Sequence, residues 1–223
     1  MELHVGGRAR RVICTLVAAA LLAACATAEP AGQTPGTGQT PGSQTLPAAV
    51  AAGAVTMMVR GNGASSGDAI EVTLTRTAKA GPGDLVLTVP AGTRLVSADA
   101  SAQNMVIGRV RGRMLGGDRF TPGTEIRLAG NAPVTYLLEA FCADFEKENP
   151  SDQVTFTLGP EDLVLACIVA QSSSRSVQAI QAAVWIHTGN VSHRTVNEKF
   201  PVSDSDWAAA VSMVDGCRKK TAR

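Results

Sequence analysis

The sequence carries little charge, and the charge that it has is balanced. Charged residues make up 17% of the 223 residues, with 20 Lys and Arg against 19 Asp and Glu, so the formal net charge is +1. A protein that binds nucleic acid through its phosphates shows a basic surface and a strongly raised isoelectric point. We therefore expect no nucleic-acid partner. The apolar fraction of 45% is still sufficient for a hydrophobic core, which excludes a wholly disordered chain.

Histidines and the motifs of common enzymes are also scarce. No Walker loop is present, and Gly61, Gly63 and Gly67 are not spaced as in a dinucleotide-binding fingerprint. We also expect no G-x-S-x-G elbow of a serine nucleophile. His187 and His193 flank a Gly-Asn turn, where we expect both to be exposed. We predict no metal site, no cofactor and no catalytic residue, and keep a surface hydrolase with an unrecognised site as an alternative.

The most apolar stretch of the chain lies near its start. Three arginines between residues 8 and 11 precede Val12–Ala24, which consists of apolar and small residues apart from Thr15. This run is shorter than the roughly 20 residues of a membrane-spanning helix, but it has the layout of a signal peptide. It ends in Leu22-Ala23-Ala24-Cys25, which is similar to the lipobox of bacterial lipoproteins, whose cysteine is lipidated. The alternative is an ordinary secretory cleavage site at which Cys25 is incidental.

Lipidation of Cys25 would anchor the protein to a membrane outside the cytoplasm without a spanning segment. We expect a cell-envelope location, and the outer membrane if the cell has one, because no Asp follows Cys25 to retain the protein at the inner membrane. Residues 26–48 are rich in Gln, Thr, Pro and Gly, a composition that cannot form a core. The predicted divisions are a signal peptide (1–24), a lipidated cysteine with a disordered tether (25–49), a folded domain (50–217) and a basic tail (218–223).

Short strands are predicted in the first part of the folded domain. Ile70–Thr75 alternates apolar and polar residues as a half-buried strand does, and Gly and Pro turns separate it from similar runs. Seven or so short strands with such turns are typical of an antiparallel sandwich or barrel. The candidate strands are Val55–Val59, Ile70–Thr75, Leu85–Val89, Met105–Val110, Thr124–Leu128, Val134–Cys142 and Val154–Leu158.

Helices are predicted after Gly159. Pro160 and two acids mark the start of the first, although its apolar run also fits a buried strand. The spacing of Ser203 and Asp206 indicates a capping box at the start of the last. The predicted helices are Leu163–Ala170, Val177–Gly189 and Ser203–Gly216. The predicted fold class is α+β, with an antiparallel β-sandwich followed by about three C-terminal helices.

Three cysteines remain once Cys14 leaves with the signal peptide and Cys25 is lipidated. Cys142, Cys167 and Cys217 allow one disulfide and one free thiol, and disulfides are permitted outside the cytoplasm. The sequence leaves the pairing open.

Gln181 is unusual because it lies on the face of its helix that is expected to meet the core. A buried amide without a partner costs about 1–3 kcal/mol, so we expect Gln181 to be hydrogen-bonded. One interpretation is a bond to backbone where the strands meet the helices. The other is that Gln181 meets Cys142.

Phe141-Cys142 at the end of a strand, followed by Gln181-Ala182-Ala183-Val184-Trp185 in a helix, resembles the paired motifs of bacterial thioester domains. These are surface adhesin modules in which a Cys and a Gln side chain condense into an internal thioester. The resemblance covers roughly residues 135–210, with Ile180 where the family has Thr. It implies that Cys142 and Gln181 form the bond, that Phe141 and Trp185 pack beside it, and that a lysine amine of a partner attacks it.

Two non-enzymatic functions follow from these features. The first is a lipid-anchored extracytoplasmic adhesion or interaction module that attaches covalently, through a Cys142–Gln181 thioester, to a protein or another amine-bearing surface ligand. The alternative is an envelope lipoprotein that binds noncovalently or is structural, with a disulfide and no thioester.

Replacing Cys25 by Ala should abolish membrane anchoring and leave unprocessed precursor, because the lipid is attached to this cysteine before the signal peptide is cleaved. Cell fractionation and labelling with a radioactive fatty acid measure both effects. Continued anchoring and processing of the Cys25→Ala protein would show that Cys25 is not the lipidated residue.

Overall fold

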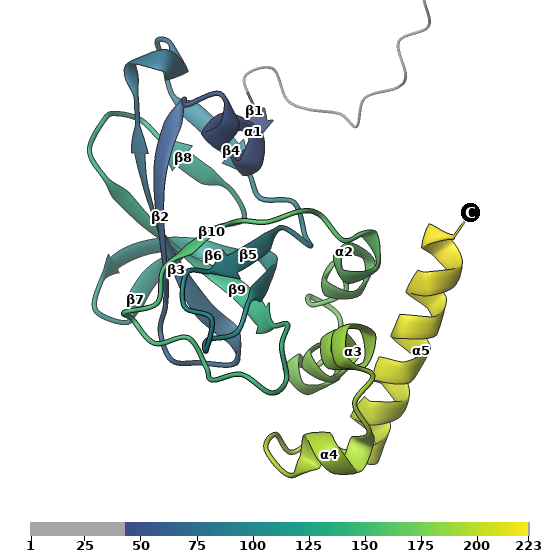
Figure 1. Ribbon diagram of the computed structural model, residues 1–223. Helices are drawn as coiled ribbons and strands as arrows, with labels where there is room; N and C mark the ends of the chain where they lie inside the picture. Colours follow the sequence, from purple (N-terminus) through teal and green to yellow (C-terminus); the bar gives the residue numbers. More distant parts are fainter. Residues whose placement is uncertain (1–42, 223) are drawn as a thin grey trace, which may run out of the picture. The chain divides into compact units, whose positions relative to one another are not determined.

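Ten strands and five helices make up the part of the chain that the structure describes, residues 43–222 of a computed structural model (Figure 1). The strands are β1 (Ser43–Thr45), β2 (Val55–Gly61), β3 (Ser66–Arg76), β4 (Leu85–Thr88), β5 (Arg94–Ser97), β6 (Met105–Gly116), β7 (Arg119–Pro122), β8 (Ile126–Leu128), β9 (Val134–Cys142) and β10 (Phe156–Leu158). The helices are α1 (Leu46–Ala51), α2 (Leu163–Val169), α3 (Val177–Gly189), α4 (His193–Asn197) and α5 (Asp204–Thr221).

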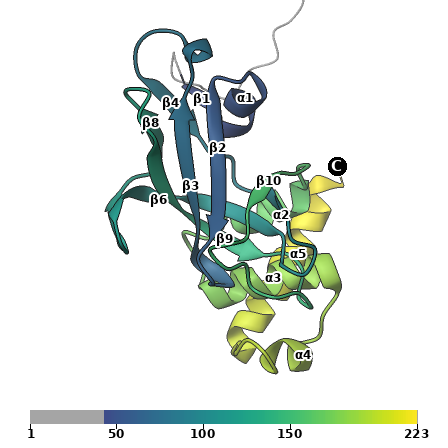
Figure 2. The same cartoon turned by 60° about the vertical axis from the view of Figure 1, so that its left-hand side comes forward.

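The larger sheet is antiparallel and nearly closes on itself. Its strand order is β10-β5-β6-β9-β3-β2, and β7 pairs with β6 outside this order. Figure 2 shows the long strands β2 and β3 side by side. An isolated bridge between Arg60 in β2 and Thr155 beside β10 connects the two ends of the order, so the sheet approaches a barrel.

The central strand of this sheet is β9, which lies between β6 and β3. Every residue from Tyr136 to Cys142 is buried, which explains why this run is apolar at nearly every position instead of alternating. The exception is Glu139, whose carboxylate accepts a hydrogen bond from Arg109 Nε at 2.8 Å. This ion pair allows a charged side chain to stay within the buried strand.

A smaller sheet extends the fold towards the start of the described chain. It has the order β1-β4-β8, with β1 parallel to β4 and β8 antiparallel to it. Thr45 then caps α1 by accepting a hydrogen bond from the Ala48 N–H at 3.3 Å, and Leu46 and Ala49 are buried. Residues 43–49, which the prediction assigned to the tether, thus form β1 and part of α1, and Leu46 lies in the core. The signal peptide, Cys25 and the rest of the tether lie outside the described residues.

Three of the helices form a layer against the end of the sheet. α3 contacts both α2 and α5, and it also contacts β9 (Figure 1). A disulfide between Cys167 in α2 and Cys217 in α5 joins residues 50 positions apart. Closing a loop of this length stabilises a folded chain by about 4 kcal/mol in the chain-entropy account. Within residues 43–222, no helix is long and apolar enough to cross a membrane.

The seven predicted strands are present, several of them with different ends, and strands precede helices over most of the described chain. The two-sheet arrangement differs from a simple antiparallel sandwich, since β1 is parallel and the larger sheet curves towards closure. Strands β1, β5 and β7 and helices α1 and α4 were not predicted. Each is at most six residues long, too short for a periodic pattern to indicate it.

The first two predicted helices agree with the structure to within one residue, and the last one is longer than predicted. α2 begins at Leu163, after Pro160 and after Asp162, whose carboxylate accepts hydrogen bonds from two N–H groups of the first turn. α3 ends at Gly189, and the next residue, Asn190, is left-handed at φ 50°. α5 continues through Gly216 to Thr221, so most of the predicted basic tail is helical. Lys and Arg in the last turn of a helix interact favourably with its dipole, which supports this extension.

Neither histidine is the exposed turn residue that was predicted. His187 lies in the last turn of α3 and its Nε2 is 3.2 Å from Asp162 Oδ2, so it ties α3 to the start of α2. His193 begins α4 and its ring stacks on Trp207 at 4.8 Å between centroids. Both therefore hold helices together.

Replacing Ser203 by Ala should lower the free energy of unfolding by about 0.5–2 kcal/mol, because the hydroxyl caps α5. Ser203 Oγ accepts a hydrogen bond from the Asp206 N–H at 3.1 Å and donates one to its carboxylate at 2.8 Å. Urea denaturation measures the change. Ser212→Ala, at an exposed position inside α5, is the matched control and should not destabilise the protein. An unchanged midpoint and slope for Ser203→Ala would contradict the capping role.

Candidate functional site

The side chain of Gln181 is paired with the backbone of Cys142. The Cys142 N–H donates to Gln181 Oε1 at 3.0 Å, and Gln181 Nε2 donates to the Cys142 carbonyl at 2.8 Å. Gln181 is fully buried, so both ends of its amide are used where water cannot reach. The side-chain amide thus pairs with the last residue of β9 in the way that the backbone of a neighbouring strand would. Gln181 is therefore hydrogen-bonded, as its buried position requires. Its partner is backbone, and this backbone belongs to Cys142.

The sequence of α3 explains how Gln181 reaches β9. Ser176 caps the helix by accepting a hydrogen bond from the Ala179 N–H at 3.1 Å, which fixes its start. The buried face also includes Ala182 and Ala183. Their small side chains let the helix backbone approach the sheet closely enough for a Gln amide to span the gap.

The end of β9 is held from other directions as well. The Cys142 N–H also donates to the Ser65 carbonyl at 3.0 Å, just before β3 begins. Met105 in β6 lies opposite Cys142 in the sheet, and the next residue, Ala143, donates to the Asn104 carbonyl at 2.8 Å. Cys142 is therefore fixed in position by two strands and one helix.

The Cys142 thiol is buried and free. It is the one unpaired cysteine of residues 43–222, because Cys167 and Cys217 form the disulfide. Its Sγ donates to Met105 Sδ at 3.4 Å and lies 4.0 Å from Asn149 Oδ1. Burial raises the pKa of this thiol well above its usual range, and the negative charge of Asp144 raises the pKa further. At neutral pH the sulfur therefore keeps its proton.

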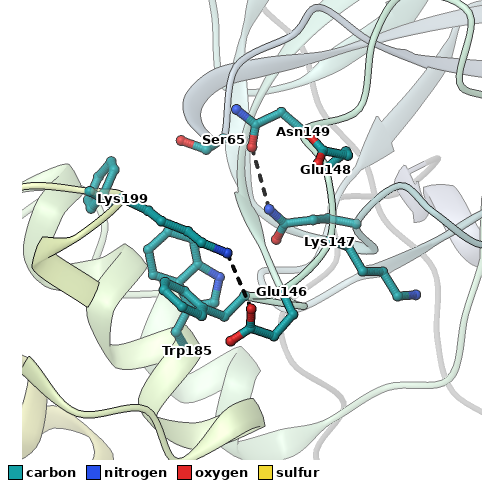
Figure 3. A pocket seen from close by; sticks show the side chains of 10 residues that line it. Ser65, Glu146, Lys147, Glu148, Asn149, Trp185 and Lys199 are labelled. Atoms are coloured by element: carbon teal, nitrogen blue, oxygen red, sulfur yellow. Dashed lines mark hydrogen bonds and ion pairs between the residues drawn. The ribbon is translucent and has the colours of Figure 1, made fainter. Parts of the chain in front are cut away.

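A pocket of about 370 Å³ lies beside this pair (Figure 3). Ser65 and Asn149 connect it to Cys142, since the first accepts from the Cys142 N–H and the second lies near its sulfur. Trp185, one helical turn beyond Gln181, supplies part of another wall. The lining residues are Ser65, Gln103, Phe145, Glu146, Lys147, Glu148, Asn149, Trp185, Lys199 and Phe200.

Aromatic rings build one side of the pocket. Phe145 and Phe200 each meet the Trp185 ring edge-on, at centroid distances of 5.1 and 5.4 Å. Lys199 Nζ lies 4.8 Å from the centre of the Phe145 ring and 3.2 Å from Glu146 Oε2. Trp185 thus lines the pocket from the helix that carries Gln181.

Phe141, unlike Trp185, is not among the residues that line the pocket. It is fully buried, and a Cβ at Gly108 would lie 3.1 Å from its ring, so it packs against the β6 backbone in the core. The lining residues Gln103, Asn149 and Lys199 were not predicted as site residues. No local pattern marks them, because they come from three separate loops.

The sequence contains one G-x-S-x-G string, contrary to the expectation that it has none. Gly63-Ala64-Ser65-Ser66-Gly67 has the spacing of a serine-nucleophile elbow, but it joins β2 to β3 in a hairpin. An elbow places its serine between a strand and a helix, so the motif lacks its required context. The ten residues that line the pocket beside Ser65 include no histidine to act as its base.

No family model, no curated protein and no solved structure matches the chain. Across residues 43–222, no cluster of His, Cys, Asp or Glu side chains is placed to hold a metal ion. The resemblance to thioester domains therefore depends on Phe141-Cys142 and on Gln181–Trp185, together with the contacts that these residues make.

Replacing Gln181 by Leu should lower the free energy of unfolding by about 1–3 kcal/mol, because the buried Cys142 carbonyl loses the donor that Gln181 provides. Chemical denaturation monitored by circular dichroism measures this change. Gln178→Leu, at an exposed position of the same helix, is the matched control and should have little effect. Equal stability of Gln181→Leu and the unaltered protein would show that the amide pairing does not hold α3 to β9.

Proposed function

We propose that this protein is a lipid-anchored extracytoplasmic adhesion or interaction module in which Cys142 and Gln181 condense into an internal thioester. The observation that carries the proposal is the two-fold hydrogen bonding of the Gln181 amide to Cys142. The disulfide between Cys167 and Cys217 supports it, because it leaves the Cys142 sulfur available. Attachment to the membrane rests on the lipobox-like sequence that ends at Cys25.

The condensation needs no group beyond the two side chains. Cys142 Sγ attacks Gln181 Cδ, the sulfur–carbon bond forms, and the carbon–nitrogen bond breaks. The thiol proton moves to the leaving nitrogen, which departs as ammonia, so atoms and charges balance without an external base. The hydrogen-bonded amide is held beside the residue that attacks it, which lowers the entropic part of the barrier.

The backbone of Cys142 supports this step electrostatically. Its N–H already donates to Gln181 Oε1, the atom on which negative charge develops when the sulfur adds to the carbonyl carbon. A donor that is in place before the reaction stabilises the tetrahedral intermediate at no reorganisation cost. Burial raises the pKa of the thiol, so the attack has to be accompanied by transfer of the thiol proton to the leaving nitrogen.

Burial supports the lifetime of the product. Cys142 and Gln181 are both fully buried, so water would reach a thioester between them slowly. An amine that enters from the adjacent pocket would attack Gln181 Cδ, form an amide bond and release the Cys142 thiol. This reaction links the module covalently to its partner without turnover.

The scaffold in this proposal is a β-sandwich-type body closed by C-terminal helices. The antiparallel order of the larger sheet and the packing of α3 against β9 support it. Such a body fixes the end of β9 against a rigid helix, as the condensation requires.

The alternative is a noncovalent or structural envelope lipoprotein. The same two hydrogen bonds favour it, because they satisfy the Gln181 amide without any reaction. In this case Cys142 is a core residue in contact with Met105, and the disulfide is the only covalent cross-link of the described domain.

Intact-protein mass spectrometry separates the two proposals. A thioester makes the chain lighter by one ammonia, in addition to the two hydrogens lost to the disulfide. Methylamine should then add its own mass and release a thiol, because amines open thioesters and leave disulfides intact. Cys142→Ala and Gln181→Ala should each abolish the ammonia loss.

Cys167→Ala and Cys217→Ala are the controls, since each removes the disulfide and should keep the ammonia loss. A mass that lacks two hydrogens only, with no methylamine adduct, would refute the thioester and support the noncovalent alternative.

A further inference from the structure

Two buried polar atoms of the pocket have no hydrogen-bond partner among the described residues. They are Gln103 Oε1, an acceptor, and Trp185 Nε1, a donor, and both side chains are only 3% exposed. Buried polar groups are nearly always paired in native proteins, so each exception needs an explanation. Here the residues that carry the acceptor and the donor both line the same cavity.

The orientations of both groups are fixed by their neighbours. Gln103 Nε2 donates to Asn149 Oδ1 at 3.4 Å, which leaves Oε1 as the free end of the amide. The Trp185 ring is held between Phe145 and Phe200. Figure 3 shows Trp185 and Lys199 on one side of the pocket and Asn149 and Lys147 on the other. The free donor and acceptor are therefore preorganised.

Charges around the pocket indicate a neutral ligand. Glu146 and Glu148 carry negative charges, and Lys147 and Lys199 carry positive ones, so the lining has no net charge. A pocket for a phosphate would show an excess of positive charge. The volume of about 370 Å³ lies in the range of about 300–1,000 Å³ that is typical of ligand sites.

We propose that this pocket binds an extended peptide segment of the protein partner. A peptide C=O accepts the hydrogen bond of Trp185 Nε1, and a peptide N–H donates to Gln103 Oε1. An extended peptide offers both groups in alternation, is neutral along its backbone, and matches one free donor with one free acceptor. The aromatic rings of Phe145 and Phe200 provide apolar contact for its side chains.

The peptide enters by displacing Lys199. This lysine is held by an ion pair with Glu146, and both side chains are largely exposed. Surface ion pairs of this kind contribute little stability, so exchanging one for peptide contacts is feasible. The displaced ammonium group remains in water.

The inference rests on the proposed function only for the covalent step. Asn149 and Ser65 connect the pocket to Cys142, so a lysine side chain on the bound peptide would be directed towards the thioester. Binding itself needs only the pocket. The two can therefore be tested separately.

The binding test uses the full-length chain in detergent with ¹⁵N-labelled tryptophan, which gives two indole N–H signals, from Trp185 and Trp207. The probe is N-acetyl-lysine N-methylamide, which has a peptide group on each side of a lysine. It should shift the Trp185 signal downfield and leave the Trp207 signal in place, and Trp185→Phe identifies the signal. n-Butylamine, which carries the amine without peptide groups, should cause no shift.

Variants define the contacts in the same titration. Gln103→Leu should weaken probe binding about fivefold, the effect of losing one hydrogen bond between neutral groups. Gln153→Leu, at an exposed loop position, is the matched control and should bind as the unaltered chain does. Cys142→Ala cannot form a thioester and should still show the full shift.

The outcomes separate the two proposals. If the Trp185 signal does not move, the peptide site is refuted, even where methylamine forms its adduct. If the signal moves and no methylamine adduct forms, the thioester is refuted and the peptide site stands. If both hold, the probe should open the thioester about 25-fold faster than n-butylamine, about fivefold for each of its two hydrogen bonds, and Gln103→Leu should lower this preference about fivefold without slowing n-butylamine.

Discussion

The pairing of the Gln181 amide with the Cys142 backbone is the contact on which the arrangement of sheet and helices depends. It joins the middle of α3 to the end of the central strand in a region without water, where each lost hydrogen bond is costly. For the amide to reach the strand, α3 must present small residues to the sheet. α3 also packs against α2 and α5. The Cys167–Cys217 disulfide links these two helices to each other.

The pocket follows from the same constraint. Once Gln181 is fixed against β9, the helical repeat places Trp185 one turn further on and on the same side of α3. The chain after β9 then turns back over this helix, where Phe145 meets the Trp185 ring. Hydrogen bonds from Gln103 and Glu148 backbone groups pin this loop to the segment before β6. Backbone hydrogen bonds thus hold this part of the pocket lining in place.

The sequence predicts the two elements of the site closely, because each carries a strong local signal. The bounds of β9 follow from a continuous apolar run that ends at Cys142, and those of α3 from an apolar face of helical period. The lining of the pocket has no such signal. Gln103 and Lys199 are polar loop residues whose positions depend on contacts distant in the chain, and the disulfide partner of Cys217 depends on how α2 and α5 pack. The burial of Leu46 likewise depends on a tertiary contact, which its Pro-rich surroundings conceal.

The two proposed functions start from the same arrangement of Cys142 and Gln181. They differ in what happens to the proton of the Cys142 thiol. In a structural role, the raised pKa of Cys142 is a simple result of burial and makes the sulfur inert. In a thioester role, the leaving ammonia needs this proton, so the proton has to move from sulfur to nitrogen as the sulfur attacks. The hydrogen bonds that make the fold stable also hold the Gln181 amide beside the residue that would attack it. In the structure the Cys142 sulfur contacts Met105, so the thioester role requires it to leave this contact and reach Gln181 Cδ.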